Sequence, residues 1–333
     1  MKEGHYRVVV EGGPDITARI NDRFLGLTIT DAAGDDSDSF SLKLDNRDDL
    51  LKFPGTGTRL RLWIGLEGEI RDKGVFTVDE ISEDLWLGDL EISGKALDTK
   101  GPIKGQKTRT WAATTLGAMG QKIASEAGYG FKCHPSLSSI KVPHTNQKAE
   151  SDLNLMTRLC KKHKGIMKFG DGMMLITTKD SNETATGKPL PIVDIDDPSE
   201  TKGRVTLQER GTYGAVVVTW FDAERQANIA LTVKGNREGA THTLKGKYLN
   251  QDEAIAAATS YLAAQERGRA TMTMDLPLTP DITAPGQVRV KNHRKTANGV
   301  WYVESATHWV GPEQASNTSL SLTTEHYDAD PPK

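Results

Sequence analysis

Cysteine is scarce in this 333-residue chain, which has only Cys133 and Cys160. Such usage indicates a reducing compartment, where free thiols are ordinary small core residues. No stretch approaches the roughly 20 apolar residues of a spanning helix. The N-terminal segment MKEGHYRVVVEGG also lacks the apolar region of a signal peptide. We therefore expect a protein with no stable membrane association, folded in the compartment where it is made.

A surplus of one charge is also missing. The chain has 42 basic and 45 acidic side chains, which are interspersed and give a net charge of −3. A protein that grips nucleic acid through phosphate contacts would carry a basic block, as would a polybasic membrane surface. Hydrophobic residues make up 36% of the chain, and the mean hydropathy is −0.50. These low values predict several small domains with long loops.

The common catalytic motifs are absent too: the sequence has no GxSxG, phosphate loop, dinucleotide fingerprint or HExxH. Paired carboxylates can serve glycoside hydrolysis, which needs two of them across a cleft. Two clusters raise that possibility: Asp35, Asp36 and Asp38, and Asp194, Asp196 and Asp197. They lie beside Gly, Ser and Pro, where Asp bonds to the backbone of turns. We interpret both clusters as turn residues.

Aromatic residues amount to only 6%, which provides no long stripe for stacking carbohydrate. Trp301 and Trp309 lie on alternating segments, so we expect them in the core or at an interface. Cys133-His134, His144 and Cys160-x-x-His163 suggest zinc ligands, but their spacing matches no metal signature. We expect a buried thiol and solvated histidines there, and no metal.

Apolar and polar residues alternate with period two through the first hundred residues, and glycine-rich turns separate the runs. The apolar members are Phe40, Leu42 and Leu44, then Leu60, Leu62 and Ile64, then Leu90 and Ile92. This pattern is typical of half-buried antiparallel strands. We predict a first β-barrel over residues 1–104.

Helical spacing replaces the alternation at 105–180, which we predict to be an α+β insertion with two helices. The first helix has apolar residues at Leu116, Met119, Ile123 and Ala127, and Gly128 ends it. The second covers ESDLNLMTRLCKKHKG, with one face formed by Leu153, Met156 and Cys160. Lysines in its last turn suit the negative end of the helix dipole.

Strand patterning returns at 181–327, which we predict to be a second β-barrel with an inserted helix at 250–268. Asn250 and Glu253 form a capping box, Gly268 ends the helix, and its apolar face is Ile255, Ala258 and Leu262. The predicted strands carry Val216, Val218 and Trp220, then Ile229, Leu231 and Val233, then Met272, Met274 and Leu276, and finally Leu320 and Leu322. The polar tail at 328–333 is predicted to be flexible.

The two ends of the chain resemble each other. Residues 54–98 and 285–328 each contain a Pro-Gly turn, an alternating strand, a Gly-Val-aromatic-x-Val-acid motif and another alternating strand. The motif residues are Gly74, Val75, Phe76, Val78 and Asp79 in one copy, and Gly299, Val300, Trp301, Val303 and Glu304 in the other. Strand–turn–strand segments can be alike by chance. Three elements in the same order instead indicate a duplicated small barrel.

A central motif is similar to a known family. The segment HTNQKAESDLNLMTRLC resembles the signature of the late control protein D family of phages, with matches at Gln147, Glu150, Ser151, Asp152, Leu153, Met156, Arg158 and Leu159. The opening SFSLKLD to GVFTVDEI and the closing PGQVRV to GVWYVESATH also resemble that family. Ser151 or Asp152 can cap the helix, and Leu153, Met156 and Leu159 are expected to pack it against the barrel.

The resemblance implies the hub of a contractile (P2-like) phage tail or R-type bacteriocin, related to the hub part of type VI secretion spike proteins. It implies a homotrimer whose two similar barrels per chain adapt a six-fold tail tube to a three-fold spike. The chain lacks a spike β-helix or lysozyme segment, so the spike is expected to be a separate protein. Further implied partners are a tube or tube-initiator protein, baseplate wedge proteins and a tape-measure protein, with DNA only in transit through a lumen.

The implied location is the virion tail baseplate, assembled in the host bacterial cytoplasm. The protein is expected to be no enzyme, with no catalytic, cofactor-binding or metal-binding residues. Two alternatives stay open at this point: a tail-tip peptidoglycan hydrolase, and a carbohydrate-binding module for host attachment.

Overall fold

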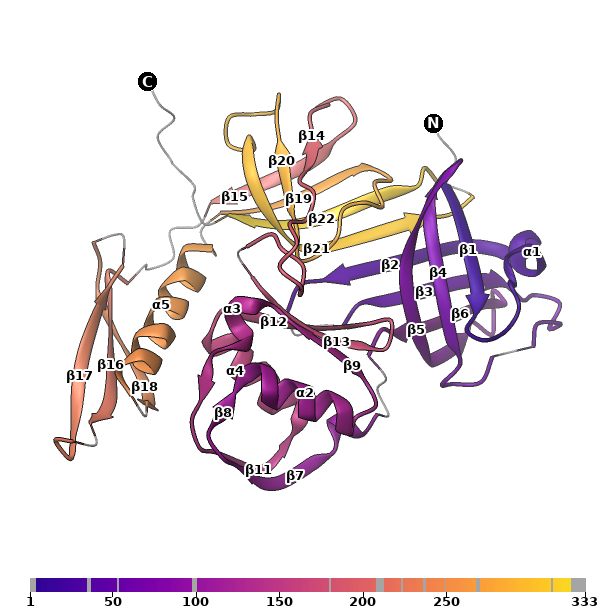
Figure 1. The fold of residues 1–333 in the computed structure, drawn as a ribbon. Helices are drawn as coiled ribbons and strands as arrows, with labels where there is room; N and C mark the ends of the chain where they lie inside the picture. The colour runs from indigo at the N-terminus through magenta and orange to yellow at the C-terminus, as the bar shows by residue number, and fades with distance from the viewer. Residues whose placement is uncertain are drawn as a thin grey trace.

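The computed structural model describes residues 4–34, 37–52, 54–97, 101–179, 181–207, 213–222, 224–235, 238–248, 250–267, 270–312 and 314–324. Within them the chain is mainly β, as the alternating patterns predict (Figure 1). The tail predicted at 328–333 lies outside these residues, as do Asp35, Asp36 and Gly268. No helix of the described chain is long and apolar enough to cross a lipid bilayer.

One large, largely antiparallel sheet organises the molecule. Its strands from the N-terminal part are β1 (Gly4–Val10), β2 (Phe24–Ala32), β3 (Ser39–Asp45), β4 (Arg59–Leu66), β5 (Glu69–Glu83) and β6 (Asp89–Lys95). Its strands from the C-terminal part are β14 (Val193–Ile195), β15 (Lys202–Leu207), β19 (Ala270–Pro277), β20 (Gln287–Val290), β21 (Gly299–Val310) and β22 (Asn317–Thr324). The main path runs β1-β4-β5-β6-β3-β2-β21-β22-β19-β15, and β20 pairs with both β21 and β14. Short helices α1 (Thr17–Ile20) and η1 (Asn21–Arg23) precede β2.

The alternation predicted for these strands is confirmed by their burial. Phe40, Leu42 and Leu44 of β3 have 3%, 1% and 3% of their surface exposed. The apolar positions predicted on β4, β6, β19 and β22 are buried in the same way. Because successive side chains of a strand point to opposite faces, this alternation directs one face of the sheet into a core.

Two halves of the sheet repeat one topology. We call β2 to β6 the first unit, with spatial order β4-β5-β6-β3-β2, and β15 with β19 to β22 the second unit, with spatial order β20-β21-β22-β19-β15. The strands also follow one another along the chain in the same order: β2, β3, β4, β5 and β6 correspond to β15, β19, β20, β21 and β22. The ladder pairs correspond position by position: Leu60 with Phe76 and Leu62 with Gly74 in the first unit, Val288 with Trp301 and Val290 with Gly299 in the second. The internal repeat seen in the sequence is therefore a repeat of strand order and register.

The acid of the repeated motif marks the same irregularity in both units. The ladder between β5 and β6 shifts between Val78 and Glu80, and the ladder between β21 and β22 shifts between Val303 and Ser305. Asp79 or Glu304 is thus the extra residue of a β-bulge, which bends its strand and sharpens the local twist. The motif glycine ahead of each bulge has positive φ, +91° at Gly74 and +136° at Gly299. Glycine is favoured there because such a backbone strains residues with a Cβ.

Two separate barrels are not confirmed. The units share one continuous sheet, because β2 of the first unit pairs with β21 of the second. Among the described residues no ladder joins β1 back to β2, so hydrogen bonds do not close the first unit. In Figure 1, β1, β4 and β5 instead stand steeply across β2 and β3, so that the sheet curls around its core.

Residues 101–179 form a compact α+β region with its own core. Its elements are η2 (Pro102–Lys104), β7 (Gln106–Trp111), β8 (Thr114–Thr115), α2 (Leu116–Glu126), β9 (Gly130–Cys133), α3 (Pro135–Ser138), β10 (Lys141–Val142), β11 (Thr145–Ser151), α4 (Asp152–Lys162), β12 (Gly165–Gly170) and β13 (Met173–Thr178). Both predicted helices are present as α2 and α4. Helix α2 follows its prediction: Leu116, Met119 and Ile123 are buried, and Gly128 has φ +79° just beyond its end.

The predicted face of α4 needs correction. Leu155 and Met156 are fully buried and Cys160 is 1% exposed, whereas Leu153 is only partly buried. The helix also packs within the α+β core and not against the large sheet. Helix contacts follow the position of neighbouring elements, which spacing within one helix does not reveal.

A third body combines β16 (Ala215–Asp222), β17 (Ala227–Lys234), β18 (Thr241–Tyr248) and α5 (Gln251–Arg267). The three strands form a separate sheet in the order β17-β16-β18 with α5 alongside, so these predicted strands do not join the second unit (Figure 1). Asn250 caps α5 by accepting a hydrogen bond from the Glu253 amide at 2.8 Å. Two residues of the predicted face, Ala258 and Leu262, pack in the core as predicted, but Ile255 is 37% exposed and Ala254 is buried in its place.

Four core clusters follow from this packing: one for β1 to β6, one for the α+β region, one for the second unit and one for α5 with its sheet. Leu97 and Ile103 pack in the α+β cluster, just ahead of the boundary predicted at 104/105. The domain boundaries themselves stay predictions.

Candidate functional site: the junction between the two units

The two units are joined edge to edge by β2 and β21, which form an antiparallel ladder from Leu27 opposite Val310 to Ala32 opposite Ser305. Core-facing residues of both strands are buried: Leu27 and Ile29 have none of their surface exposed, and Val310 has 1%. On the other face the hydroxyl oxygens of Thr30 and Thr307 lie 3.2 Å apart. The junction therefore fixes how one unit sits beside the next.

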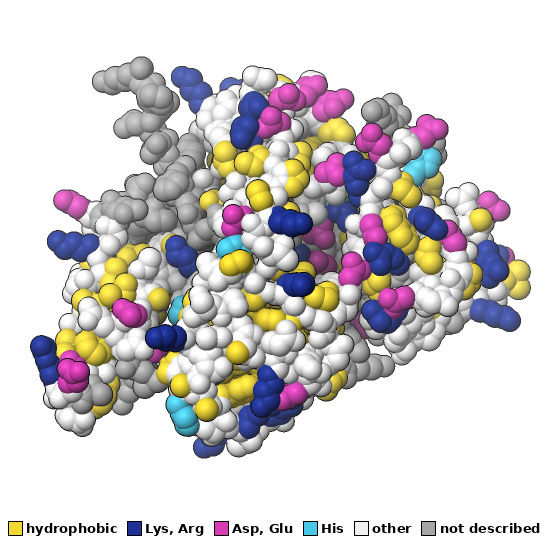
Figure 2. Space-filling model, in the orientation of Figure 1, with side chains coloured by type: hydrophobic (Ala, Val, Ile, Leu, Met, Phe, Trp, Pro, Cys, Tyr) yellow, Lys and Arg dark blue, Asp and Glu magenta, His cyan; other side chains and the backbone are white. Residues whose placement is uncertain are grey.

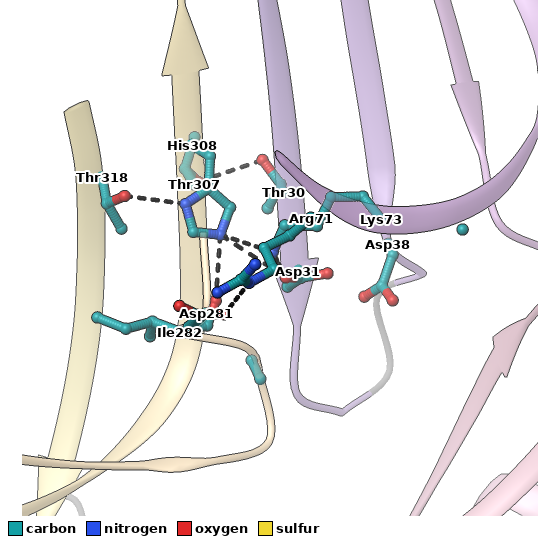
Figure 3. Close-up of polar contacts among 12 residues, drawn as sticks. Thr30, Asp31, Asp38, Arg71, Lys73, Asp281, Ile282, Thr307, His308 and Thr318 are labelled. Atoms are coloured by element: carbon teal, nitrogen blue, oxygen red, sulfur yellow. Dashed lines mark hydrogen bonds and ion pairs between the residues drawn. The ribbon is translucent and has the colours of Figure 1, made fainter. Parts of the chain in front are cut away.

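A buried polar network occupies the core-facing side of this junction (Figure 3). Lys73 from β5 donates to Oδ2 of Asp31 on β2 over 3.0 Å, and its Nζ lies 3.0 Å from Nε2 of His308 on β21. The side chains of Lys73 and Asp31 are only 3% and 9% exposed, and that of His308 is fully buried. The ion pair thus connects β5 to β2, the strand of the first unit that pairs with β21 of the second unit.

His308 has polar partners on both ring nitrogens. Its Nε2 lies 3.0 Å from Lys73 Nζ and 3.1 Å from the Ile282 carbonyl oxygen, and its Nδ1 lies 2.9 Å from the Thr318 hydroxyl. Burial lowers the pKa of His308, and the charge of Lys73 adds to this effect. Burial by itself would raise the pKa of Asp31, but contacts with His308, Lys73 and Lys168 hold it below its usual range. The lowered pKa favours the neutral form of the imidazole beside the charged pair.

A second set of contacts attaches the α+β region to both units. Lys168 of β12 pairs with Asp38 of the first unit at 2.9 Å and donates to the carbonyl of Ala284 near the second. Lys179, just beyond β13, pairs with the bulge acid Glu304 at 3.0 Å. The α+β region is thus tied across the junction by lysines.

The family-like motif forms a polar network of its own. Gln147 is 1% exposed, and its amide donates to the Asp152 carboxylate at 2.8 Å and to the Glu150 carbonyl at 2.9 Å. Its amide oxygen accepts from Arg109 and Trp111, each at 3.0 Å. Each motif side chain in this set therefore serves hydrogen bonding inside the α+β region.

Asp152 is the centre of this network. Its side chain is 1% exposed and accepts from Lys107 at 2.6 Å and from Arg109 at 2.8 Å. Burial opposes ionisation, but Lys107, Gln147 and Arg109 together lower the pKa of Asp152. Ser151 caps α4 by accepting from the Asn154 amide. A buried carboxylate held by two cations has a structural use, and the arrangement leaves it no exposed face for a substrate.

The carboxylates singled out in the sequence are distributed over separate places. Asp194 is on strand β14 and not in a turn, and it pairs with Lys291 at 2.6 Å and Arg289 at 3.5 Å. Asp197 accepts from the amide and hydroxyl of Ser199, which is the turn role predicted for it. Asp38 accepts from the Ala32 amide and pairs with Lys168, and burial raises its pKa.

The cysteines and histidines considered as metal ligands have other contacts. Cys133 and Cys160 are free, and burial raises their pKa values to about 11 and about 12. His134 is buried, not solvated, and its ring bonds Glu183 at 2.8 Å and Ser136 at 2.7 Å. Within the described ranges, no three His, Cys, Asp or Glu side chains gather as a metal site.

Trp301 is a core residue, 2% exposed, whose indole donates to the Ala297 carbonyl, and Trp309 is half-buried beside Gly26. On the face shown in Figure 2, basic and acidic side chains are interspersed, as the sequence composition predicts.

Sequence reasoning missed Asp31, Lys73 and His308. A usable signal was present, because the apolar alternation Leu27, Ile29 leads to Asp31 at the next core-facing position. The run Ala306, His308, Val310 has the same form. A polar residue on a core-facing register predicts a buried partner.

Solved structures show which proteins share this fold. A tail protein from Neisseria meningitidis MC58 superimposes with a TM-score of 0.71 at 13% identity, covering 97% of both chains. A type VI secretion component from E. coli gives a TM-score of 0.56 at 9% identity, covering 90% of this chain and 73% of that one. The fold is therefore one found in phage-type tail proteins and in a type VI secretion component.

Sequence comparison defines the family. Residues 103–314 match the family described as phage tail baseplate hub (GPD). Two proteins named "Probable baseplate hub protein", from Escherichia phages 186 and P2, are each 32% identical over 208 residues, or 62% of this chain and 54% of theirs. This chain thus spans about half the length of the curated relatives it matches. The chain belongs to the phage tail baseplate hub family, a family of structural tail proteins, and the resemblance noted in the sequence is confirmed.

Proposed function

We propose that the protein is a trimeric hub in the baseplate of a contractile phage-type tail. Each chain would contribute its first and second units to one ring, giving six similar units around an axis with three-fold chain symmetry. Such a ring can match a six-fold tube on one side and a three-fold spike on the other.

The observation that carries this proposal is the repeat itself. The two units agree in strand order, ladder register and the position of the β-bulge. They are also joined side by side through β2 and β21. Three chains can meet a six-fold partner only by presenting two like surfaces each, and this repeat supplies them.

The proposed partners follow from that position: a separate spike protein, a tube or tube-initiator protein, wedge proteins and a tape-measure protein. DNA would pass through the lumen of the ring without stable binding. Three chains of net charge −3 sum to about −9, and repulsion between this charge and phosphates would favour free passage.

Mass measurement and imaging of the purified chain test the proposal together. Light scattering should give three chains per particle, and electron-microscope class averages should show a ring with six similar lobes. A particle of two or six chains, or a ring with three lobes, would contradict the proposed function.

The proposal includes no catalytic activity. Purified protein incubated with cell-wall sacculi should release no soluble fragments above a heat-inactivated sample, with lysozyme as the positive control. Release of muropeptides would favour the alternative of a tail-tip hydrolase.

A further inference from the structure

The pairing surfaces of the junction occur twice in the chain, but among the described strands only one set is paired. The repeat makes β15 the counterpart of β2, and β5 the counterpart of β21. Strand β2 pairs with β21 beyond the bulge, and no described strand of the chain pairs with β15 and β5 in the corresponding way. Within the described residues, one copy of each junction surface is therefore unpaired.

The unused part of β5 begins directly after the bulge. On the side facing β4, backbone pairing ends at Val78, which bonds Thr58 and Gly57. Residues 80–83 then pair with β6 alone in the described chain. In the second unit the same stretch, Ser305–Val310, is the part that accepts β2.

The unused edge of β15 lies at the other end of the sheet. Strand β15 pairs with β19 through Lys202–Leu207, and its second edge pairs with no described strand. An open edge of this kind presents free amides and carbonyls for another strand.

Side-chain exposure differs between the junction that forms and its unpaired counterparts. In the junction that forms, Leu27 and Ile29 are fully buried and Val310 is 1% exposed. Their counterparts behave differently: Leu207, which corresponds to the buried Asp31, is 50% exposed, and Leu85, in the turn just beyond β5, is 96% exposed. Leu207 therefore stands exposed where the other unit has a buried residue.

We infer that β15 of one chain adds to the β5 edge of the next, antiparallel, with Leu207 opposite Ile81, Thr206 opposite Ser82 and Val205 opposite Glu83, where β5 ends. The register is that of the β2–β21 ladder transferred through the repeat. The inference rests on the proposed trimer and identifies its interface as the same strand pairing already present within the chain.

Side-chain chemistry agrees with this register. The Thr30–Thr307 hydroxyl contact of the existing junction becomes Thr206 beside Ser82. Basic Lys202 and Arg204 on β15 lie toward the end of β5, where Asp84 follows the strand, whereas Glu83, opposite Val205, is on the other face. Opposite charges on facing strands stabilise pairing and set its register.

Cysteine cross-linking tests the pairing directly. Residues opposite each other on antiparallel strands have Cβ atoms about 4.5–5.5 Å apart, within disulfide reach. The double variant Ser82→Cys, Thr206→Cys should give covalent trimers under mild oxidation. A mixture of the two single variants should give only covalent dimers.

Two controls make the result specific. The pair Glu80→Cys with Thr206→Cys is shifted by two residues and should cross-link far less, and each single variant alone reports any background from Cys133 and Cys160. If light scattering finds a trimer but the double variant does not cross-link, the inferred ladder is wrong while the trimeric hub stands. If no trimer forms, the proposed function itself fails.

A surface variant provides a second readout. Leu207→Asp should raise the dissociation constant of the trimer by about tenfold or more, because a charge would enter the ladder opposite Ile81. Its melting temperature as an isolated chain should change little, since the Leu207 side chain is 50% exposed there. The matched control is Leu50→Asp, at a leucine 72% exposed and outside the pairing edge. Equal assembly of both variants would overturn the inference.

Discussion

Lys73 and Asp31 form an ion pair, 3.0 Å between Nζ and Oδ2, in which neither side chain is more than 9% exposed. Replacing Lys73 with Met should lower the free energy of unfolding by about 3–5 kcal/mol, because the Asp31 carboxylate would be left buried without its cation. Urea denaturation measures this. Lys291→Met is the control: its pair with Asp194 is more than 40% exposed on both sides and should contribute less than about 1 kcal/mol.

The double variant Asp31→Leu, Lys73→Met separates charge from packing. Removing both charges takes away the unpaired carboxylate, so we expect much of the stability lost in Lys73→Met to return. A double variant as unstable as Lys73→Met alone would show that the cost came from lost packing.

Stability should fall on mild acidification because of His308. Its folded pKa is lowered by burial, so below the unfolded value of about 6.5 the unfolded state binds more protons. The contribution of the neutral imidazole is therefore complete above that pH and is lost as the pH falls toward the folded pKa. His163, whose pKa is also lowered by burial, acts in the same direction.

His308→Gln isolates this effect. The difference in unfolding free energy between pH 7.5 and pH 5.5 should be smaller in His308→Gln than in the parent protein, although the variant is less stable at both pH values. An unchanged difference would assign the acid sensitivity to other groups.

Helix α4 offers a test of its observed register. Met156→Ala should cost about 2–5 kcal/mol, because the side chain is fully buried in the α+β core. Leu153→Ala should cost clearly less, since Leu153 is only partly buried. Thermal unfolding of the two variants measures the contrast, and equal losses would restore the face predicted from spacing. Asp196→Asn, in an exposed loop, should leave both folding and assembly intact.

The two thiols should be free but slow to react. Titration with a thiol reagent in denaturant should find two groups per chain, with no stoichiometric zinc by elemental analysis. In the native protein at pH 8 both should react slowly, because burial raises their pKa values to about 11 and about 12 and leaves little thiolate. Stoichiometric zinc would contradict the expectation of a metal-free protein.

Local patterns predicted the strands and helices well, because periodicity reports which side chains share a face. The repeated motif also predicted an equivalence that extends to the bulge at Asp79 and Glu304. Turns and bulges depend on a few neighbouring residues, so the turn glycines and the bulge acid can be recognised in the sequence.

The closure of the sheet and the buried faces of the helices were harder to predict from the sequence. Whether β2 pairs with β1 or with β21 depends on contacts between segments nearly three hundred residues apart, which no periodicity reports. One residue of each predicted helix face was wrong, Leu153 on α4 and Ile255 on α5, because spacing alone does not show which neighbouring element a helix packs against. The Lys73–Asp31–His308 network likewise combines three distant strands, and only the polar interruptions of apolar alternation indicated it.

The excursion carrying β16 to β18 and α5 interrupts the second unit between β15 and β19, where the first unit has only the connection 33–38 between β2 and β3. The second unit thus carries an insertion at the turn where the first unit has a short connection. In a ring of alternating first and second units the insertions would recur at every other position. An insertion at that one turn is therefore enough to give a ring of six like units three-fold symmetry, with the paired strands left unaltered.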